Sequence, residues 1–299
     1  MKYDCLSSCT LCPRECHADR FNTTGFCSSP VEVTAARAAL HMWEEPCISG
    51  EEGSGTVFFS GCPLKCVYCQ NSPIAHQKTG RKITDDRLAE IFLELQDKGA
   101  NNINLVTPTH YTISVINALD KARSHGLHLP VVYNCSGYEK AETIEMLRGY
   151  IDIYLTDFKY LDQNAAARYS NAPDYPEKAR SALSQMFSQQ PCAGFDERGM
   201  MKKGIIVRHL MLPGQINDTK NIIRYLYETY HDDIFISIMN QFTPMPGLDA
   251  YPELNRKITD REYDEVIDFA VDLGIENAFV QDGAAASESF IPCFDCEGI

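Results

Sequence analysis

Short runs of β-branched and aromatic residues alternate with longer amphipathic stretches from Thr56 onward. The short runs predict strands and the longer stretches predict helices. The predicted strands are 56–60, 102–106, 130–135, 151–156, 204–211 and 234–239. The predicted helices are 85–98, 113–125, 140–147, 176–188, 219–230 and 260–273, and a last apolar run, 277–281, follows them. This alternation is typical of parallel sheets, so we expect the α/β class and a partial (βα)6, TIM-like barrel.

The first 54 residues show little strand or helix periodicity, and we expect them to form a separate Cys-rich metal-binding module. Six of the 13 cysteines lie within the first fifty residues. A small unit of this kind buries too little apolar surface to offset its ordering entropy, and bound metal is a common remedy. The expected parts are therefore a module at 1–54 and a barrel with a C-terminal extension at 55–299.

The composition and the net charge of the chain argue against membranes and nucleic acids as binding partners. The chain has 299 residues, 44% of them hydrophobic, which is enough for a full core. No run approaches the roughly 18 apolar residues of a membrane span, and MKYDCLSSC lacks the features of a signal peptide, so we expect a cytoplasmic protein that binds no membrane. In that reducing compartment cysteines favour metal ligation over disulfides. The net charge of −14 argues against a nucleic-acid partner, because phosphate backbones bind basic surfaces.

Three cysteines follow the first predicted strand in a C-x3-C-x2-C arrangement: Cys62, Cys66 and Cys69. Gly61 permits a tight turn and Pro63 restricts the loop, so both favour convergence of the thiolates. A 4Fe-4S cluster has four irons, and three cysteines leave one iron open to a small molecule. The alternative is a zinc site that takes a fourth ligand from elsewhere, with His76 the most obvious choice.

Four more cysteines form a C-x2-C-x3-C-x10-C set in the N-terminal module: Cys9, Cys12, Cys16 and Cys27. Four thiolates leave no open position, so the set predicts a closed site that holds either a second iron–sulfur cluster or a structural zinc. Cys5 and Cys47 stay unassigned, since lone cysteines of this kind are more often buried small apolar residues than ligands. Cys293 and Cys296 make only half a site, and we interpret their segment as a solvated tail.

Polar residues follow three of the predicted strands, in 107–111, 134–137 and 156–159. A parallel barrel places its active site at these strand ends. Thr109 either binds a polar ligand or, like Thr112, caps the next helix. Asp157 and Lys159 are either a surface ion pair or part of the site, and their place beside the other strand ends favours the site.

Arg208 lies inside an apolar predicted strand. If its side chain faces the barrel interior, burial is costly unless the guanidinium meets a carboxylate. With a side-chain period of two, the neighbouring His209 then points the opposite way and packs against a helix.

Further motifs run along nearly the whole chain: LCPREC, WEEPCISG, GSGTVFFSGC, NLVTPTHY, YNCSGYE, DIYLTDFKY, YSNAPDYPE, VRHLMLPG and QFTP. With these motifs, the three-cysteine loop and Tyr68 before its last cysteine, the sequence resembles the radical S-adenosylmethionine (SAM) superfamily, in particular its pyruvate formate-lyase activating enzyme-like subgroup. The resemblance implies that the open iron binds the amino and carboxylate groups of SAM. A donor such as flavodoxin or ferredoxin then supplies the electron that splits the sulfonium and gives a 5′-deoxyadenosyl radical.

The resemblance also implies a set of residues on the SAM side of the site: Tyr68, Thr107, Thr109, Asn134, Ser136, Asp157 and Arg208. Asn134 and Cys135 fall near a monovalent cation beside the SAM carboxylate, and Asp157 falls on a ligand of that cation. Arg208 falls on the arginine that contacts the carboxylate. Thr107-Pro108-Thr109 replaces the family's usual Gly-Gly-Glu stretch, so the SAM amino group is contacted differently. The extra cysteines also precede the cluster motif, whereas many glycyl-radical activating enzymes place theirs after it.

Three functions compete at this stage. The first is a radical SAM enzyme that abstracts hydrogen from a glycine of a partner protein and so activates it. The second is a radical SAM enzyme that modifies a small metabolite or a peptide directly. The third is a non-catalytic iron–sulfur or zinc protein, which leaves the polar strand ends without a purpose.

Overall fold

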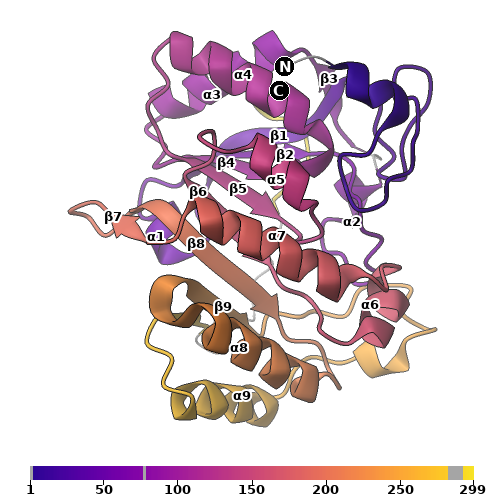
Figure 1. The fold of residues 1–299 in the computed structure, drawn as a ribbon, viewed down its shortest axis with the longest axis vertical. Coiled ribbons are helices and arrows are strands. Elements are labelled where there is room, and N and C mark those ends of the chain that lie inside the picture. Colours follow the sequence, from indigo (N-terminus) through magenta and orange to yellow (C-terminus); the bar gives the residue numbers. More distant parts are fainter. Residues whose placement is uncertain (1–2, 77–78, 282–291) are drawn as a thin grey trace.

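The computed structural model describes residues 3–76, 79–281 and 292–299. Its centre is a sheet in the order β10-β9-β8-β6-β5-β4-β2-β1-β3 (Figure 1). Seven neighbouring strands are parallel: β2 (Ser54–Phe59), β4 (Ile103–Val106), β5 (Val131–Cys135), β6 (Ile153–Asp157), β8 (Met201–Leu210), β9 (Phe235–Met239) and β10 (Ala278–Val280). These match the six predicted strands and the last apolar run. The predicted α/β class and the partial barrel are therefore confirmed.

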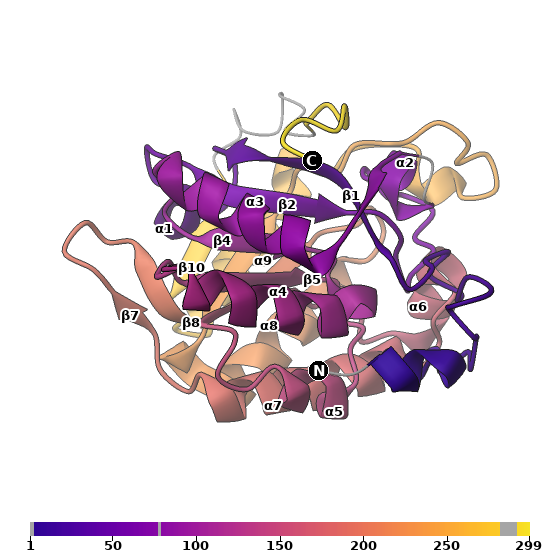
Figure 2. The same ribbon diagram turned by 90° about the horizontal axis from the view of Figure 1, so that it is seen from above.

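Six helices cover the outer face of the sheet, as Figures 1 and 2 show: α3 (Asp85–Asp97), α4 (Thr112–Ser124), α5 (Ala141–Met146), α7 (Tyr175–Gln189), α8 (Ile216–Tyr230) and α9 (Asp260–Asp272). All six were predicted by helical spacing. Thr84 starts α3 by accepting a hydrogen bond from the Arg87 backbone N–H, and Thr259 forms a capping box with Glu262 at the start of α9.

Several shorter elements escaped the sequence analysis: α1 (Pro46–Ser49), α2 (Ser72–Ala75), α6 (Gln163–Ser170), β3 (Arg81–Ile83) and β7 (Gly194–Phe195), together with the 3-10 helices η1 (Tyr3–Ser8), η2 (Thr109–Tyr111), η3 (His231–Asp233) and η4 (Pro252–Leu254). Each holds at most eight residues, which is too few for a clear periodic signal. In the described part of the chain no helix is long and apolar enough to cross a membrane.

The strand β1 (Val33–His41) corrects the sequence analysis, which predicts no strand there. β1 runs antiparallel to β2, from Ala35 opposite Phe59 to His41 opposite Ser54. Its sequence VTAARAALH is rich in alanine, which has a low strand propensity, so pairing with β2 decides its conformation. Residues 33–41 therefore belong to the barrel sheet, although they lie within the stretch expected to form the separate module.

The two faces of the sheet carry different side chains. Ile205 and Val207 of β8 pack in the main core, which also holds the buried side chains of the covering helices. Ile206, between them, packs in the barrel interior with Ile153 and with Ile48 of α1. The short helix α1 thus contributes apolar side chains to one part of the barrel interior. Polar side chains of the interior lie at the carboxyl ends of the parallel strands.

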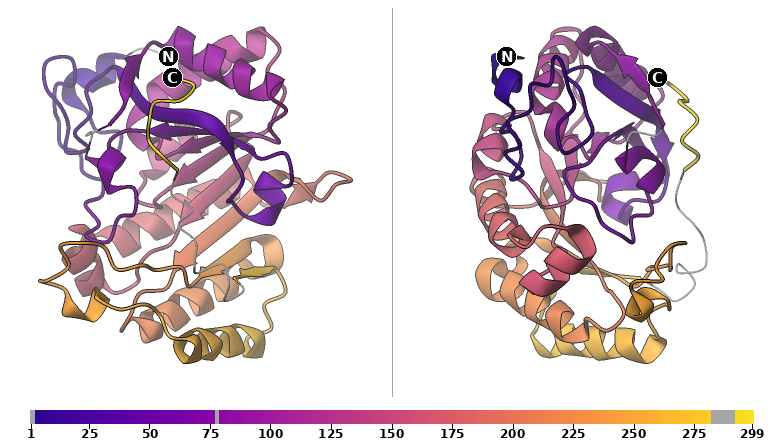
Figure 3. Two further views of the ribbon diagram at one scale, coloured as in Figure 1. Left: turned by 180° about the vertical axis from the view of Figure 1, so that it is seen from behind. Right: turned by 90° about the vertical axis from the view of Figure 1, so that its right-hand side faces the viewer.

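The C-terminal segment 292–299 is irregular in structure but docked against the sheet, and the interpretation as a solvated tail is wrong. The Cys296 N–H donates to the Ala36 carbonyl over 2.9 Å, and the Ala38 N–H donates to the Glu297 carbonyl over 2.8 Å. Arg37 pairs with Asp295 and Glu297. Figure 3 shows this segment in yellow beside β1.

The ring of Phe294 in this segment lies edge-to-face with Phe58, with 5.5 Å between centroids. It also joins Ala36, Ile74 and Val106 in one apolar cluster. Backbone pairing and this aromatic contact, which no local pattern reveals, hold the segment on the edge of the open barrel.

Candidate active site

The cysteine loop leaves β2 through Gly61, which has φ +94°. A side chain at this position would meet the Ser29 Oγ at 2.1 Å, so only glycine fits, and the predicted tight turn is confirmed. The loop then folds on itself, because the Cys69 N–H donates to the Cys66 carbonyl over 3.2 Å. The Cys66 thiol also accepts a hydrogen bond from the Ser170 hydroxyl, 2.9 Å away.

All three cysteines of the loop line one cavity of about 140 Å³. The other side of this cavity consists of residues from four strand ends: Thr107, Asn134, Cys135, Ser136, Asp157, Lys159 and Arg208. The structure therefore brings together most of the residues that the sequence places on the SAM side. Their convergence follows from the parallel strands, whose carboxyl ends meet at the same edge.

Each nitrogen of Arg208 donates a hydrogen bond to a side chain of the chain itself. Its Nε donates to Asp157 over 3.1 Å, its Nη1 donates to Glu44 over 3.1 Å, and its Nη2 donates to the Asn134 side-chain oxygen over 2.6 Å. The expected inward orientation is confirmed, but the carboxylates that pair with the guanidinium are Glu44 and Asp157 of the chain itself, where the sequence analysis expected the carboxylate of SAM. Because each nitrogen has its own acceptor, the planar guanidinium is held in one orientation.

Asp157 carries a second ion pair, to the Lys159 ammonium at 2.6 Å. Burial alone would raise the pKa of Asp157, but the nearby Lys159 and Arg208 charges lower it below its ordinary value. Burial opposes the charge on Lys159, whereas Asp157 and Cys66 raise its pKa above its ordinary value. The cavity thus keeps an ionised carboxylate between two cations.

The cysteine thiols also respond to burial. Burial raises the pKa of Cys69 to about 12, with a further contribution from Cys66, while Lys159 opposes the shift. Burial is also the main cause of the raised pKa of Cys62, and the neighbouring Cys66 and Cys69 add to it. Thiolates that repel one another in a closed space are stabilised when a cationic centre binds between them.

The three thiols line one space, as the cysteine ligands of an iron–sulfur cluster do. Among residues 3–76, 79–281 and 292–299, no group of three His, Cys, Asp or Glu side chains is placed to hold one metal ion. In a cluster each cysteine binds a different iron, so the thiols border a space instead of converging on one point. His76, the suggested fourth zinc ligand, does not line the cavity.

Two predicted residues do not line the cavity. The Tyr68 hydroxyl lies 2.5 Å from the Tyr160 hydroxyl, which in turn lies 2.7 Å from that of Ser170. Tyr68 is therefore joined to the loop through Tyr160 and Ser170, because the Ser170 hydroxyl donates to Cys66. Thr109 neither lines the cavity nor caps α4, because its hydroxyl donates to the Glu139 carboxyl over 2.7 Å.

His209 and the lone cysteines Cys5 and Cys47 do not line the cavity. His209 points away from the cavity, and its ring nitrogens lie 2.7 Å from the Phe158 carbonyl and 3.0 Å from the Thr219 hydroxyl of α8. The predicted packing against a helix is confirmed. Cys47 is buried, as is usual for a lone cysteine, whereas Cys5 is exposed.

Glu44 is the site residue that sequence reasoning missed. It follows β1, and its carboxylate accepts hydrogen bonds from Asn104 at 3.0 Å and Asn134 at 3.2 Å in addition to Arg208. The available signal was the pair of acidic residues in the motif WEEPC, beside an apolar strand end. The adjacent Glu45 is also buried, and desolvation raises its pKa.

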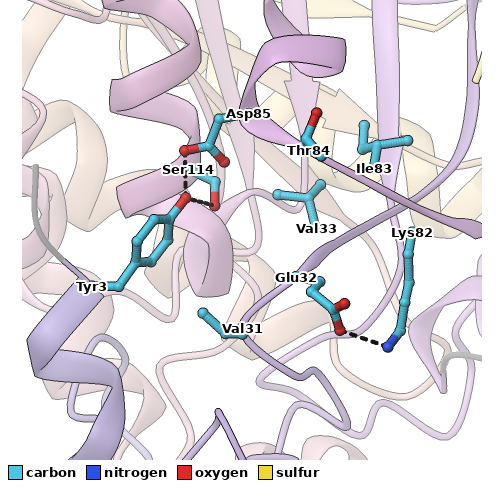
Figure 4. A pocket seen from close by; sticks show the side chains of 9 residues that line it. All are labelled: Tyr3, Val31, Glu32, Val33, Lys82, Ile83, Thr84, Asp85 and Ser114. Carbon is cyan, nitrogen blue, oxygen red and sulfur yellow. Dashed lines mark hydrogen bonds and ion pairs between the residues drawn. The ribbon is translucent and has the colours of Figure 1, made fainter.

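A larger cavity of about 490 Å³ lies at the junction of η1, β1, β3 and the first turns of α3 and α4 (Figure 4). The Tyr3 hydroxyl bonds with Asp85 and with Ser114, and the Lys82 ammonium lies 2.6 Å from Glu32. Its described lining includes no cysteine, and its polar side chains bind one another, so the cavity that contains the loop cysteines remains the candidate site.

The partial barrel carries three cysteines directly after its first parallel strand, and this arrangement is typical of enzymes that bind an iron–sulfur cluster. The family profile of the radical SAM superfamily matches residues 56–226, which is more than half of the chain. The chain therefore belongs to the radical SAM superfamily, and this family implies a 4Fe-4S cluster and SAM as its cofactors.

Two curated relatives resemble the chain. An uncharacterized protein of Methanocaldococcus jannaschii is 27% identical over 277 residues, which cover 89% of this chain and 75% of the relative. A pyruvate formate-lyase-activating enzyme of Clostridium pasteurianum is 26% identical over 117 residues, which cover 36% of this chain and 46% of the relative.

Solved structures with a similar fold include SuiB of Streptococcus suis bound to S-adenosylmethionine, at 17% identity and a TM-score of 0.49 over 74% of this chain and 48% of SuiB. The FeFe-hydrogenase maturase HydG from Carboxydothermus hydrogenoformans has 12% identity and a TM-score of 0.49 over 75% of this chain and 52% of HydG. The chain thus corresponds to about half the length of these solved structures.

Proposed function

We propose that this protein cleaves SAM reductively and uses the resulting radical to abstract hydrogen from a substrate. The supporting observation is that Cys62, Cys66 and Cys69 share one cavity with the polar ends of four strands. A 4Fe-4S cluster bound there, with SAM on its open iron, supplies an electron that yields methionine and a 5′-deoxyadenosyl radical. The remaining residues of the cavity bind and orient SAM.

Arg208 and Asp157 provide the charges that a zwitterionic ligand requires. The Arg208 guanidinium lines this side of the cavity, where it attracts the SAM carboxylate, and its bond to Glu44 keeps it in place. Asp157 is an ionised carboxylate that suits the SAM amino group or a monovalent cation. Thr107, with φ +58°, lies where the family has its amino-group contact, and it lines the cavity.

For the substrate, we propose a glycine of a partner protein, activated by removal of one hydrogen atom. The partial similarity to the activating enzyme of Clostridium pasteurianum supports this choice. The open barrel supports it as well, because the end strands of the described sheet, β10 and β3, do not pair with each other, and such an opening admits a peptide loop.

Direct modification of a small metabolite or a peptide is the second candidate. The docked C-terminal segment favours it, because Phe294 packs with Ile74 and Val106, two residues that line the cavity. A large protein loop would have to pass this segment, whereas a small substrate would not.

SAM cleavage is tested with anaerobically reconstituted protein, a low-potential reductant and SAM. We expect slow formation of 5′-deoxyadenosine and methionine even without substrate, since the open iron is sufficient for binding SAM. Cys66→Ala provides the control, because it removes one cluster ligand from the loop. Equal amounts of 5′-deoxyadenosine from the variant and the wild type would refute the proposal.

The number of SAM molecules consumed separates the two kinds of substrate. Activation of a partner protein consumes about one SAM per partner chain, because the radical is stored on the partner. Direct modification of a metabolite or peptide consumes SAM in every turnover. The measurement is the ratio of 5′-deoxyadenosine to substrate or partner after the reaction has ended.

A further inference from the structure

The N-terminal module gathers four thiols in a segment with almost no regular structure. In the described part of residues 3–32, η1 is the single regular element. The apolar cluster of this region is small and consists of Leu6, Cys9, Leu11 and Ile113. So little buried apolar surface does not offset the entropy of ordering the segment.

The turns of the module bring the cysteines to a common side. The Cys9 backbone pairs with the opposite arm, because its N–H donates to the Ala18 carbonyl and its carbonyl accepts from the His17 N–H, both over 3.0 Å. The Glu15 N–H closes a turn by donating to the Cys12 carbonyl over 3.0 Å. Glu15 and His17 have φ values of +38° and +51°, a costly conformation for residues other than glycine.

Gly25 leaves open the space between two of the thiols. A Cβ atom at this position would lie 3.3 Å from the Cys16 Sγ and 3.4 Å from the Cys27 Sγ, so both sulfurs border the same small space. Cys12 lies within electrostatic range of both Cys9 and Cys27. All four thiols are therefore near neighbours.

We propose that Cys9, Cys12, Cys16 and Cys27 hold a second iron–sulfur cluster of the 4Fe-4S type, in addition to the cluster on the Cys62 loop. Four cysteines supply one ligand for each iron, so this second cluster is closed and binds no SAM.

The surrounding groups favour an anionic cluster. Arg20 is only 1% exposed, and its Nη1 lies 3.8 Å from the Cys9 Sγ. The same guanidinium donates to the carbonyls of Ser29 and Pro30, so it is fixed beside the thiols. A fixed cation with N–H groups directed at a sulfur is the kind of outer contact that stabilises a thiolate-bound cluster.

The module is attached directly to the catalytic loop. The Cys62 N–H donates to the Cys27 carbonyl over 3.2 Å, so a ligand of one site is hydrogen-bonded to a ligand of the other. On the other side, the Arg14 Nε donates to the Pro63 carbonyl over 2.8 Å, and its Nη1 donates to the Asn171 carbonyl over 2.6 Å. The hydrogen bonds of the module therefore hold the Cys62 loop in place.

The test counts iron, sulfide and zinc in anaerobically reconstituted protein. We expect about eight irons per chain in the wild type and about four in the Cys62→Ala/Cys66→Ala/Cys69→Ala variant, with almost no zinc. Four irons in the wild type, with or without one zinc, would overturn the proposal. The wild-type count decides the question even if a variant fails to fold. It is independent of SAM cleavage, because no activity is measured.

A second variant keeps every ligand. Gly25→Val places methyl groups in the space between the sulfurs of Cys16 and Cys27, and we expect it to lose about half of the iron while the Cys62 site stays loaded. Cys192→Ala is the matched control, because Cys192 is exposed and far along the chain, and its iron content should equal that of the wild type. Full iron content in Gly25→Val would count against a cluster at this position.

Discussion

At the scale of single residues, Arg208 joins three other side chains of the site. Its three hydrogen bonds to Asp157, Glu44 and Asn134 require a planar, forked donor. Lysine keeps the charge but has no fork, so it cannot serve the three acceptors and a SAM carboxylate at once. Arg208→Lys is also milder than removal of the charge, which would leave two buried carboxylates unpaired.

We expect Arg208→Lys to weaken SAM binding by about ten- to a hundredfold, corresponding to about 1.5–3 kcal/mol for a charge-assisted hydrogen bond. Equilibrium dialysis of reconstituted protein against labelled SAM measures the change, and the iron content should stay constant. Lys202→Arg, a change on the outer surface, serves as the control. An unaltered affinity would mean that Arg208 only supports the fold.

Glu139 makes stability depend on pH. It is fully buried, and desolvation raises its pKa from 4.5 to about 8, in spite of hydrogen bonds from Thr109 and Tyr133. The unfolded chain loses this proton near pH 4.5, whereas the folded protein keeps it up to about pH 8. The stability from this group is therefore complete below the unfolded pKa and is lost as pH rises toward the folded pKa.

Glu139→Gln should remove this dependence. Between pH 5 and pH 8 we expect the variant to gain on the wild type by about 1.4 kcal/mol for each pH unit, because glutamine stays neutral throughout. Thermal unfolding of both proteins across this range measures the difference. A constant difference in Tm would show that Glu139 is ionised in the folded protein.

At the scale of elements, the C-terminal segment depends on one aromatic contact. Phe294 is half-buried against Phe58, so Phe294→Ala should lower the free energy of unfolding by about 1–2 kcal/mol. Urea unfolding measures the loss, and Phe21→Ala, at a ring that is 52% exposed, is the control. If both variants lose equally little, the segment is held by its backbone bonds and by Arg37 alone.

The helices and strands differ in how well they could be predicted from the sequence. The parallel strands and the six helices that cover them were predictable, because each lies in an apolar or amphipathic stretch whose periodicity is visible in the sequence. β1 and the C-terminal segment were not, since an alanine-rich strand and a short polar stretch become ordered only through a partner distant in the sequence. Local patterns do not contain that partner.

The residues of the candidate site also include some that the sequence predicted and some that it did not. Asn134, Asp157 and Arg208 were predictable because they end or interrupt apolar strands, and parallel strands bring such positions together. Glu44 was not, because it reaches the interior from the loop after β1, an element that the sequence does not predict. Tyr68 lies next to a ligand in sequence, yet its hydroxyl contacts Tyr160 and the side chain does not line the cavity, so proximity along the chain does not fix where a side chain points.

At the scale of the whole molecule, the buried arginine of the N-terminal module couples two regions of the chain. The Arg20 Nη1 donates to the His110 carbonyl over 2.5 Å, and the His110 ring nitrogen lies 2.8 Å from the Ser60 carbonyl, at the start of the cysteine loop. Opening the module would strip the His110 carbonyl of its partner, and a buried carbonyl left without a hydrogen bond costs about 1–3 kcal/mol. Local unfolding is therefore shared across the boundary, and the amide hydrogens of both regions should exchange with solvent as one cooperative unit. A chain shortened to begin at β1 would accordingly be a damaged barrel, and not a smaller version of the same enzyme.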